Sequence, residues 1–409
     1  MILKLSFASA KKSKKRCSMN KNISPSTFHK LSALLIACLS GLTVMAMPFI
    51  FSAIIQKLAI DEAHATLATS LEIAMIALGS IFVSLVLVKI NPRLTAIVGL
   101  VAYTAGQFLS LSSDTITLML IARGLSGIGQ GLCMGVGFSF LAQAEGGKKL
   151  LSYSAGLMSA LGLLSFSLVP ILNEYAGPDA IFWTLVSVGI LCLPLGLSIP
   201  SKKLSDEKSV DMPPQKALSL DTLFLFLMSA LFSAGSNTLW LYLDPIGASV
   251  NLTLVQIGQI GSLGLIAGML SPFFTNAAYR FSVSPIYLCL ICLITGVTSY
   301  LNATTASSTV YIASIIVMGF TYSSFLSYIR MYSAHIDGSG RATAATSGAD
   351  SLGMVVGPLV AAATLNLANS YHELGVFASL SQMFALSMGL LVAVSMWRAR
   401  GKKARLAAV

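Results

Sequence analysis

The sequence contains few charged residues. Of its 409 residues, only 10% are Asp, Glu, Lys or Arg, while 55% are hydrophobic. Soluble domains carry about 25% charged residues, so this chain has too little charge to cover the surface of a soluble protein. Acidic residues are the scarcer kind, 15 against 26 basic ones. This composition excludes a soluble fold and indicates a protein embedded in a membrane.

The residue types that build metal sites and covalent active sites are also scarce. The chain has four histidines and six cysteines, and most of the cysteines lie inside apolar stretches. Cys289 and Cys292 form one CxxC pair without the second pair that a structural zinc site requires. The sequence has no nucleotide-binding loop and no nucleophile elbow. We therefore expect no metal, no cofactor and no enzymatic activity.

Long apolar runs, in contrast, are abundant. A helix needs about 20 apolar residues to cross a bilayer, and the short polar breaks leave no room for a sizeable soluble domain. Twelve runs meet this requirement: 31–55, 66–88, 94–113, 115–142, 151–172, 180–199, 219–243, 252–275, 284–301, 308–332, 342–368 and 376–397. We predict an all-α membrane protein with twelve transmembrane helices.

The second half of the chain repeats features of the first at an offset of 192 residues. Gly127 corresponds to Gly319, and Gly156 to Gly348. Internal repetition in an apolar chain is typical of transporters built from two related bundles. We predict two six-helix halves related by pseudo-symmetry, with these boundaries: N-terminal arm 1–30, first half 31–200, linker 201–218, second half 219–397 and tail 398–409.

The basic residues report the orientation. If both termini are cytoplasmic, 23 of the 26 Lys and Arg residues lie in the inside segments. Such a bias follows the positive-inside rule. It accounts for the net charge of +11 without nucleic acid as a partner. We expect a multi-pass protein of the inner (plasma) membrane, monomeric, with the lipid bilayer and a small-molecule substrate as its partners.

Several motifs resemble the major facilitator superfamily. LIARGLSGIGQGLCMG in the fourth span is similar to that family's Arg-xxx-Gly-x-Gly-x-Gly motif, and GPDAIFW at 177–183 is similar to its entry to the sixth span. The eleventh-span stretch GRATAATSGADSLGMVVGPLV is also similar. The motif residues are Arg123, Gly127, Gly129, Gly131, Gly353, Gly357 and Pro358.

Two departures from the family pattern accompany this resemblance. SLVLVKINPR, between spans two and three, has Val88 where the family usually has an acid that helps to hold the inside gate. The fifth span lacks the Gly-Pro pair usual in exporters. The resemblance implies a secondary transporter working by alternating access. Proton-coupled efflux of a small organic molecule is favoured, with the proton gradient as its energy source.

Two alternatives stay open. One is proton-symport uptake of an organic acid or another nutrient, because the exporter signature is eroded. The other is a transporter-like membrane sensor that binds its ligand without moving it. Direction of transport distinguishes the first alternative from efflux, and counterflow in vesicles distinguishes the second.

Charges inside spans are the strongest candidates for a mechanism, because burying a charge at the bilayer centre costs about 2.5–3.5 kcal/mol on insertion scales. Glu72 and Arg123 enter their spans from the same side, at depths of roughly 9 and 12 Å, so we expect them to pair. The pair either couples transport to protons or is a static ion pair. Asp350 lies roughly 12 Å deep from the cytoplasmic side. It faces the cavity, bonds to a neighbouring hydroxyl group, or lies in a shallow, solvated position.

Further candidates carry less specific signals. Polar and aromatic residues of a substrate cavity are expected at Gln130, Asn237, Trp240 and Tyr322, because such pockets combine apolar area with a few orienting polar groups. The alternative for each is a packing or interface role. Gate or anchor positions are expected at Lys89, Arg93, Arg330 and Arg341.

Overall fold

The computed structural model describes residues 26–87, 89–201, 219–368 and 371–407, and within these ranges all the regular structure is helical. The first half comprises α2 (Thr27–Met45), α3 (Met47–Leu58), α4 (Glu62–Val86), α5 (Pro92–Leu111), α6 (Ile116–Gln143), α7 (Gly147–Ala176) and α8 (Ala180–Ser198). The second comprises α9 (Leu220–Leu241), α10 (Leu243–Ser249), α11 (Leu254–Phe281), α12 (Ile286–Thr304), α13 (Ser308–Ile336), α14 (Arg341–Ala368) and α15 (Tyr371–Ala407).

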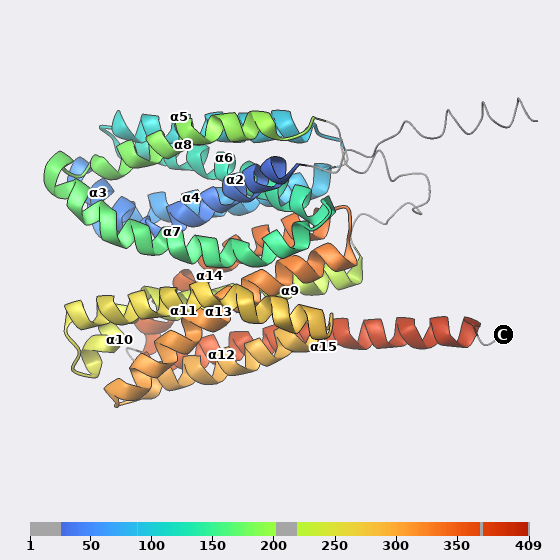
Figure 1. The fold of residues 1–409 in the computed structure, drawn as a ribbon. Coiled ribbons are helices and arrows are strands. Elements are labelled where there is room, and N and C mark those ends of the chain that lie inside the picture. The colour runs from blue at the N-terminus through green and yellow to red at the C-terminus, as the bar shows by residue number, and fades with distance from the viewer. Residues whose placement is uncertain (1–25, 88, 202–218, 369–370, 408–409) are drawn as a thin grey trace, which may run out of the picture.

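The helices form two bundles that lie against each other (Figure 1). Helices α2 to α8 make one bundle and α9 to α15 the other. The halves meet mainly where α4 packs on α14 and where α7 packs on α11 and α13. Helix α2 begins and α15 ends at the same end of the molecule (Figure 1). This is the basic end, which carries Lys89, Arg93, Arg280 and Arg341; α3 and α10 lie at the opposite end.

The structure revises three of the predicted spans. The first, 31–55, is split at Ala46 into α2 and α3, with a proline in the first turn of α3. The seventh is followed by the short helix α10. The twelfth continues without a break to Ala407, so the predicted tail from residue 398 is largely a helical extension of α15. Most of the predicted arm 1–30 and linker 201–218 lies outside the described residues.

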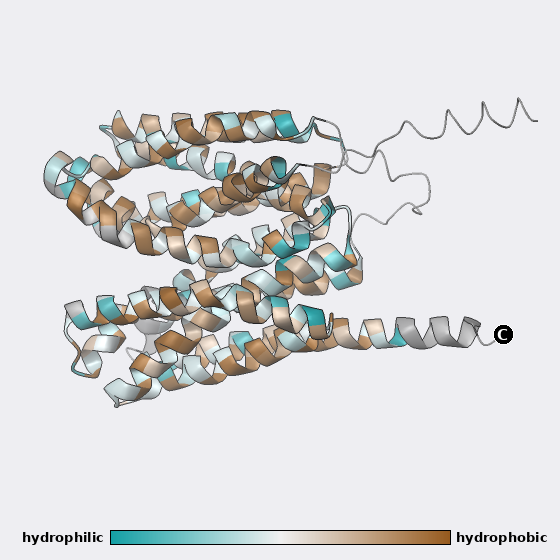
Figure 2. Ribbon diagram, viewed as in Figure 1, coloured by the Kyte–Doolittle hydropathy of each residue, from teal (hydrophilic) through white to brown (hydrophobic). Residues whose placement is uncertain are grey.

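Ten of the described helices are long and apolar enough to cross a membrane. Helices α7 and α14, with 30 and 28 residues, are as long, and they lie at the interface between the halves. Apolar colour covers the outer helices (Figure 2). Large apolar side chains such as Phe108, Trp183 and Phe273 are more than half exposed. A surface of this kind is stable only against lipid.

Glycines let the helices of the first half pack closely. A Cβ at Gly127 or Gly131 would collide with the backbone carbonyls of Glu72 and Ile76 on α4. A Cβ at Gly129, on another face of α6, would collide with the Gly99 carbonyl on α5. The motif glycines thus hold α6 between its two neighbours, as small residues do in membrane bundles.

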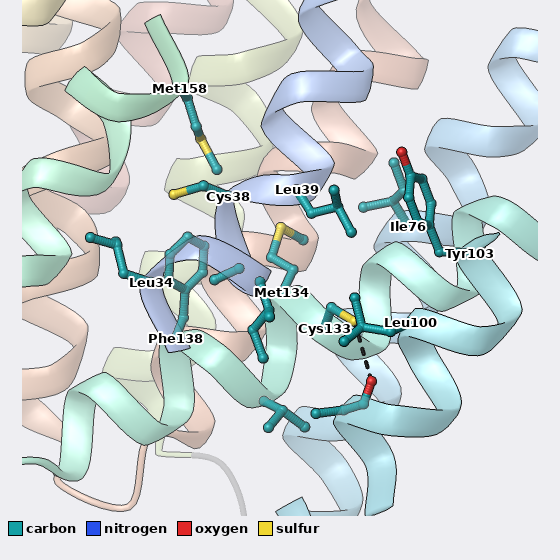
Figure 3. Packing of buried hydrophobic residues seen from close by; sticks show 14 of the residues in the cluster. Leu34, Cys38, Leu39, Ile76, Leu100, Tyr103, Cys133, Met134, Phe138 and Met158 are labelled. Carbon is teal, nitrogen blue, oxygen red and sulfur yellow. Dashed lines mark hydrogen bonds between the residues drawn. The ribbon is translucent and has the colours of Figure 1, made fainter. Parts of the chain in front are cut away.

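Sulfur-containing and apolar side chains fill the rest of this core. Cys38, Met134, Phe138 and Met158, from three helices, belong to one cluster of buried side chains (Figure 3). Cys133 donates a weak hydrogen bond to the Ala96 carbonyl over 3.7 Å (Figure 3). Helix α6 is therefore the buried centre of its half.

In the second half, α14 packs on α9 in the same manner. A Cβ at Gly353 or Gly357 would collide with the Ala230 and Ala234 carbonyls of α9. Pro358 lies inside α14, where it removes one backbone hydrogen bond and favours a bend. This close contact sets the position of Asp350, two turns earlier on α14.

Candidate functional site: a central cavity and two buried ion pairs

A cavity of about 100 Å³ lies between the two halves. Helices α2, α6 and α7 line one side of it, and α9, α11, α13 and α14 line the other. Its wall is mostly apolar. Five methionines contribute to it: Met45, Met134, Met158, Met318 and Met354. Methionine side chains are flexible and polarizable, and they adapt to ligands of different shape. The cavity therefore suits a small, largely apolar molecule.

One ion pair lies on the wall of this cavity. Arg330 on α13 and Asp350 on α14 both line it and are 2% and 4% exposed. Nη2 of Arg330 lies 4.0 Å from Oδ2 of Asp350. The other carboxylate oxygen, Oδ1, accepts a short hydrogen bond from the Ser233 hydroxyl on α9. Tyr322 donates to the same oxygen over 3.5 Å. The carboxylate is therefore held by the second half.

Arg330, in contrast, is held by the first half. Its Nη1 donates to the Ser154 hydroxyl on α7 over 2.8 Å. Both terminal nitrogens approach the Met158 sulfur, at 3.8 and 3.9 Å. The guanidinium carbon lies 4.4 Å from the centre of the Phe138 ring on α6, a cation–π contact. Arg330 thus connects the two halves at the wall of the cavity.

The second ion pair lies inside the first half. Arg123 on α6 donates from Nη1 to Oε2 of Glu72 on α4 over 3.1 Å, and both side chains are fully buried. Arg123 also donates to Gln107 and Ser110 on α5, over 2.6 Å in each case. Its guanidinium lies 5.3 Å from the centre of the Phe182 ring. The predicted pairing of Glu72 with Arg123 is present.

Neutral groups complete this second network. Oε1 of Glu72 accepts from Ser126 over 2.7 Å and from Gln130 over 2.9 Å. None of Glu72, Arg123 and Gln130 lines the cavity. The network is enclosed by α4, α5 and α6, whose close packing the motif glycines permit.

The structure corrects one expectation and refines another. Gln130, predicted in the cavity, is fully buried in the Glu72 network instead. Arg330, expected as a gate or anchor at the cytoplasmic end of its span, lies about two turns inside α13, where it lines the cavity and contacts the other half. In both cases the face of the helix on which the residue lies determines its surroundings. The sequence gives the depth of a residue along its span but not the face of the helix that points to the cavity.

The other cavity candidates line the cavity as expected. Asn237 and Trp240 on α9 and Tyr322 on α13 all contribute to its wall. Trp240 is 37% exposed and lies near the opposite end of α9. Sequence reasoning missed Ser154, Met158 and Ser233. Ser233 precedes Asn237 by one helical turn, a spacing that could have revealed it. Met158 resembles any core methionine in the sequence.

At the basic end, the halves are joined by Arg341. Its Nε donates to the Ser84 carbonyl in the last turn of α4 over 2.9 Å, and the Ser84 hydroxyl donates to the Arg341 carbonyl over 2.8 Å. Ser139 donates to the carbonyl of Gly340, whose φ of 81° favours glycine. A cation here also complements the negative end of the α4 dipole. Val88, where the family has an acid, lies outside the described residues.

Lys89 and Arg93 play no part in this contact among the described residues. Lys89 is exposed, and Arg93 donates to the Ile199 carbonyl within its own half, over 2.6 Å. Hydrogen bonds between described side chains of the two halves lie between the basic end and the contact of Ser159 with Ser323, 3.1 Å long. Ser159 and Ser323 themselves line the cavity, which extends from Arg330 and Asp350 to Trp240.

Two bundles, each with six span-length helices, enclose an ion pair in an apolar central cavity, an arrangement typical of membrane transporters. The family model of the Major Facilitator Superfamily matches residues 33–358. The chain belongs to that superfamily, and it is a multi-pass membrane transporter and not an enzyme. Transporters of this superfamily use no cofactor.

The relatives and solved structures described below are distant in sequence. An uncharacterized MFS-type transporter, YtbD of Bacillus subtilis, is 24% identical over 278 residues, which cover 63% of this chain and 70% of the relative. Among solved structures, the fucose:proton symporter FucP of E. coli has a TM-score of 0.68 at 12% identity, covering 89% of this chain and 97% of its own.

A second solved structure, the human organic anion transporter MFSD10, has a TM-score of 0.66 at 14% identity and covers 89% and 98% of the two chains. A further structure of FucP, in the outward conformation, has a TM-score of 0.69 at 14% identity, with 90% and 99% covered. At these identities the similarity shows a shared fold.

Proposed function

We propose that this protein is a secondary active transporter of the inner (plasma) membrane, which moves a small organic molecule through the central cavity by alternating access and couples that movement to protons at Asp350. The observation that carries the proposal is the ion pair on the cavity wall. Asp350 is held by the second half and Arg330 by the first. A change in the charge of Asp350 therefore changes a contact between the two halves.

The positions of the contacts between the halves support alternating access. Hydrogen bonds near the basic end, at Arg341 and Ser84, close that end. With both termini cytoplasmic, as the basic residues favour, the described arrangement is closed to the cytoplasm. In this proposal the cavity is reached from the outside in this arrangement. Rocking of the halves about the cavity would break these bonds and expose the pair to the cytoplasm.

Glu72 and Arg123 have a different role in this proposal. Their network is enclosed within one half and makes no contact with the cavity. We assign it to the stability of the first half, and we place proton coupling at Asp350 alone. The name of one structural neighbour, a fucose:proton symporter, is compatible with proton coupling.

Proteoliposomes test the proposal. Purified protein is reconstituted, and a substrate found by an unbiased thermal-shift screen is loaded as a radiolabelled tracer. A transporter gives counterflow, whereas a sensor that only binds its ligand gives none. An inward-acidic or outward-acidic gradient then reports the direction. Absence of counterflow with a ligand that binds would overturn transport as the function.

Direction has two candidate answers. Efflux is the expectation from the resemblance, and proton-symport uptake is the alternative. The chemistry of the ion pair links the direction to the charge of the substrate: a cation would compete with a proton for Asp350, and an anion would bind Arg330 when Asp350 is neutral. The first arrangement exchanges substrate for protons, and the second carries both together.

A further inference from the structure

The guanidinium of Arg330 has fewer hydrogen-bond acceptors than it can use. It has five N–H donors. Its Nε has no hydrogen-bond partner among the described residues, although the atom is buried. One good acceptor, Ser154, serves Nη1, and the remaining contacts are a weakly accepting sulfur and a carboxylate oxygen 4.0 Å away. A buried donor without an acceptor is costly, so this group is suited to an additional acceptor.

Asp350 has the reverse situation. Its Oδ1 already accepts from Ser233 and Tyr322. The unused hydrogen-bonding capacity of the pair is therefore at the cation, and Arg330 is one of the residues that line the cavity. A ligand that uses this capacity must supply hydrogen-bond acceptors, and a carboxylate does so with the geometry that a guanidinium binds best.

We infer that the substrates of this transporter are small amphipathic organic anions, whose carboxylate binds Arg330 while the apolar body lies against the methionine-lined wall. This inference rests on the proposed transport function and specifies its substrate class. Trp240 and Tyr322 add aromatic area around the body of the ligand. The whole molecule must be small, because the cavity has a volume of about 100 Å³.

Charge balance makes the anion and the proton cooperative. With Asp350 ionised, the pair is neutral and the cavity is empty of net charge. A carboxylate bound at Arg330 brings a negative charge, which a proton on Asp350 cancels. Enclosing an unbalanced charge in a low-dielectric site is unfavourable. The occluded cavity is therefore stable with both ligands or with neither, which is symport.

The side chains around Asp350 leave this carboxylate as the group that takes up the proton. The charged or titratable side chains whose influence reaches it are Arg330 and Tyr322, both on α13, and α9 contributes the neutral hydroxyl of Ser233. On α4, the carboxylate of Glu72 is bound to Arg123 and lies outside the cavity. On α2, Cys38 donates to a backbone carbonyl. The inference therefore favours proton-symport uptake over the efflux expected from the resemblance.

Binding of matched probes tests the inference. The probes are benzoate, benzylammonium and benzamide, which share one ring and differ in charge. Affinity is measured by thermal shift and calorimetry on the full-length protein in detergent, at about pH 5 and about pH 8. We expect benzoate to bind best, and at least tenfold more tightly at the lower pH. A set in which benzoate binds no better than benzylammonium and benzamide overturns the inference.

Variants locate the two charges. Asp350→Asn mimics the protonated carboxyl, so benzoate binding should persist and lose its pH dependence. Arg330→Gln should weaken benzoate binding at least tenfold, and Arg330→Lys should restore part of it. The control is Arg280→Gln, which deletes a cation at the exposed end of α11. This variant should bind benzoate as the unaltered protein does. Full benzoate binding in folded Arg330→Gln contradicts the inference.

Transport measurements separate this inference from the proposed function. Benzoate that binds but shows no counterflow supports the organic anion as the ligand and contradicts transport as the function. Proton-coupled counterflow of an organic cation, with no competition from benzoate, supports the transport function and removes the anion as substrate.

Discussion

The two buried ion pairs of this protein have the same chemical groups and different surroundings. In the first half, all three guanidinium nitrogens of Arg123 have oxygen acceptors, and Glu72 is bound on both oxygens. In the cavity, Arg330 lacks a partner at Nε and approaches Asp350 only to 4.0 Å. A saturated pair enclosed in one half stabilises that half. An unsaturated pair shared between the halves can respond to a ligand or a proton.

The largest difference between the pairs is expected in stability. Glu72→Gln leaves Arg123 buried without its counter-charge, and removing one partner of such a pair costs about 3–5 kcal/mol. Thermal unfolding in detergent should show a large decrease in the unfolding temperature of Glu72→Gln. The double variant Glu72→Gln/Arg123→Met, which removes both charges, should reverse much of this decrease. An unchanged unfolding temperature in the single variant would show that the network is dispensable.

Transport activity should depend more on the ion pair of the cavity than on the pair inside the first half. Arg330→Gln removes the cation on the cavity wall, and we expect counterflow per folded molecule to fall by about 100-fold, equivalent to about 2.7 kcal/mol. Its effect on stability should be smaller than that of Glu72→Gln, because the Arg330–Asp350 contact is long. The control Arg280→Gln should transport normally. Normal counterflow in Arg330→Gln would remove this residue from the site.

The glycines that hold the helices together should have an intermediate effect. A methyl group at Gly357 must displace the Ala234 carbonyl of α9, and overpacking of this kind typically costs about 1–3 kcal/mol. Gly258 on α11 is a matched control, since a Cβ there meets nothing within 4 Å. The unfolding temperature of Gly357→Ala should therefore fall, and that of Gly258→Ala should fall less or rise. Equal shifts would show that the close contact between α9 and α14 adds nothing.

The smallest effect is expected at the basic end. Arg341→Gln removes a charge from the end of α4, where such a contact contributes about 0.3–1 kcal/mol. The equilibrium between the state closed at the basic end and the state closed at the opposite end should shift a few-fold toward the latter. Spin labels on α3 and α10 would report this as a shorter mean distance between them. An unaltered distance distribution would show that Arg341 does not hold this end closed.

Much of the fold follows from the sequence, because the bilayer imposes simple rules. Apolar runs of about 20 residues gave the helices, and the repeat at 192 residues gave the two halves. Depth along each span paired Glu72 with Arg123 correctly. The break at Ala46 was missed because it leaves the segment apolar on both sides. The extension of α15 was missed because residues 398–407 are rich in basic residues, a composition that predicts a tail.

The candidate site was less predictable, because a site depends on which face of each helix points inward. Arg330 and Gln130 were at the right depth for either role, and only the packing of α13 and α6 decided between them. The missing acid near Val88 indicated a different gate. Arg341 was among the expected gate positions, but its partner Ser84, on a helix of the other half, could not be read from the sequence.

The most direct test of the account is a comparison of two carboxylates in one assay. Transport driven by a proton gradient is measured for Asp350→Asn and Glu72→Gln, each normalised to the amount of folded protein. The account predicts that Asp350→Asn loses its response to the gradient and that Glu72→Gln keeps it. Loss of the response in Glu72→Gln with retention in Asp350→Asn would contradict the account.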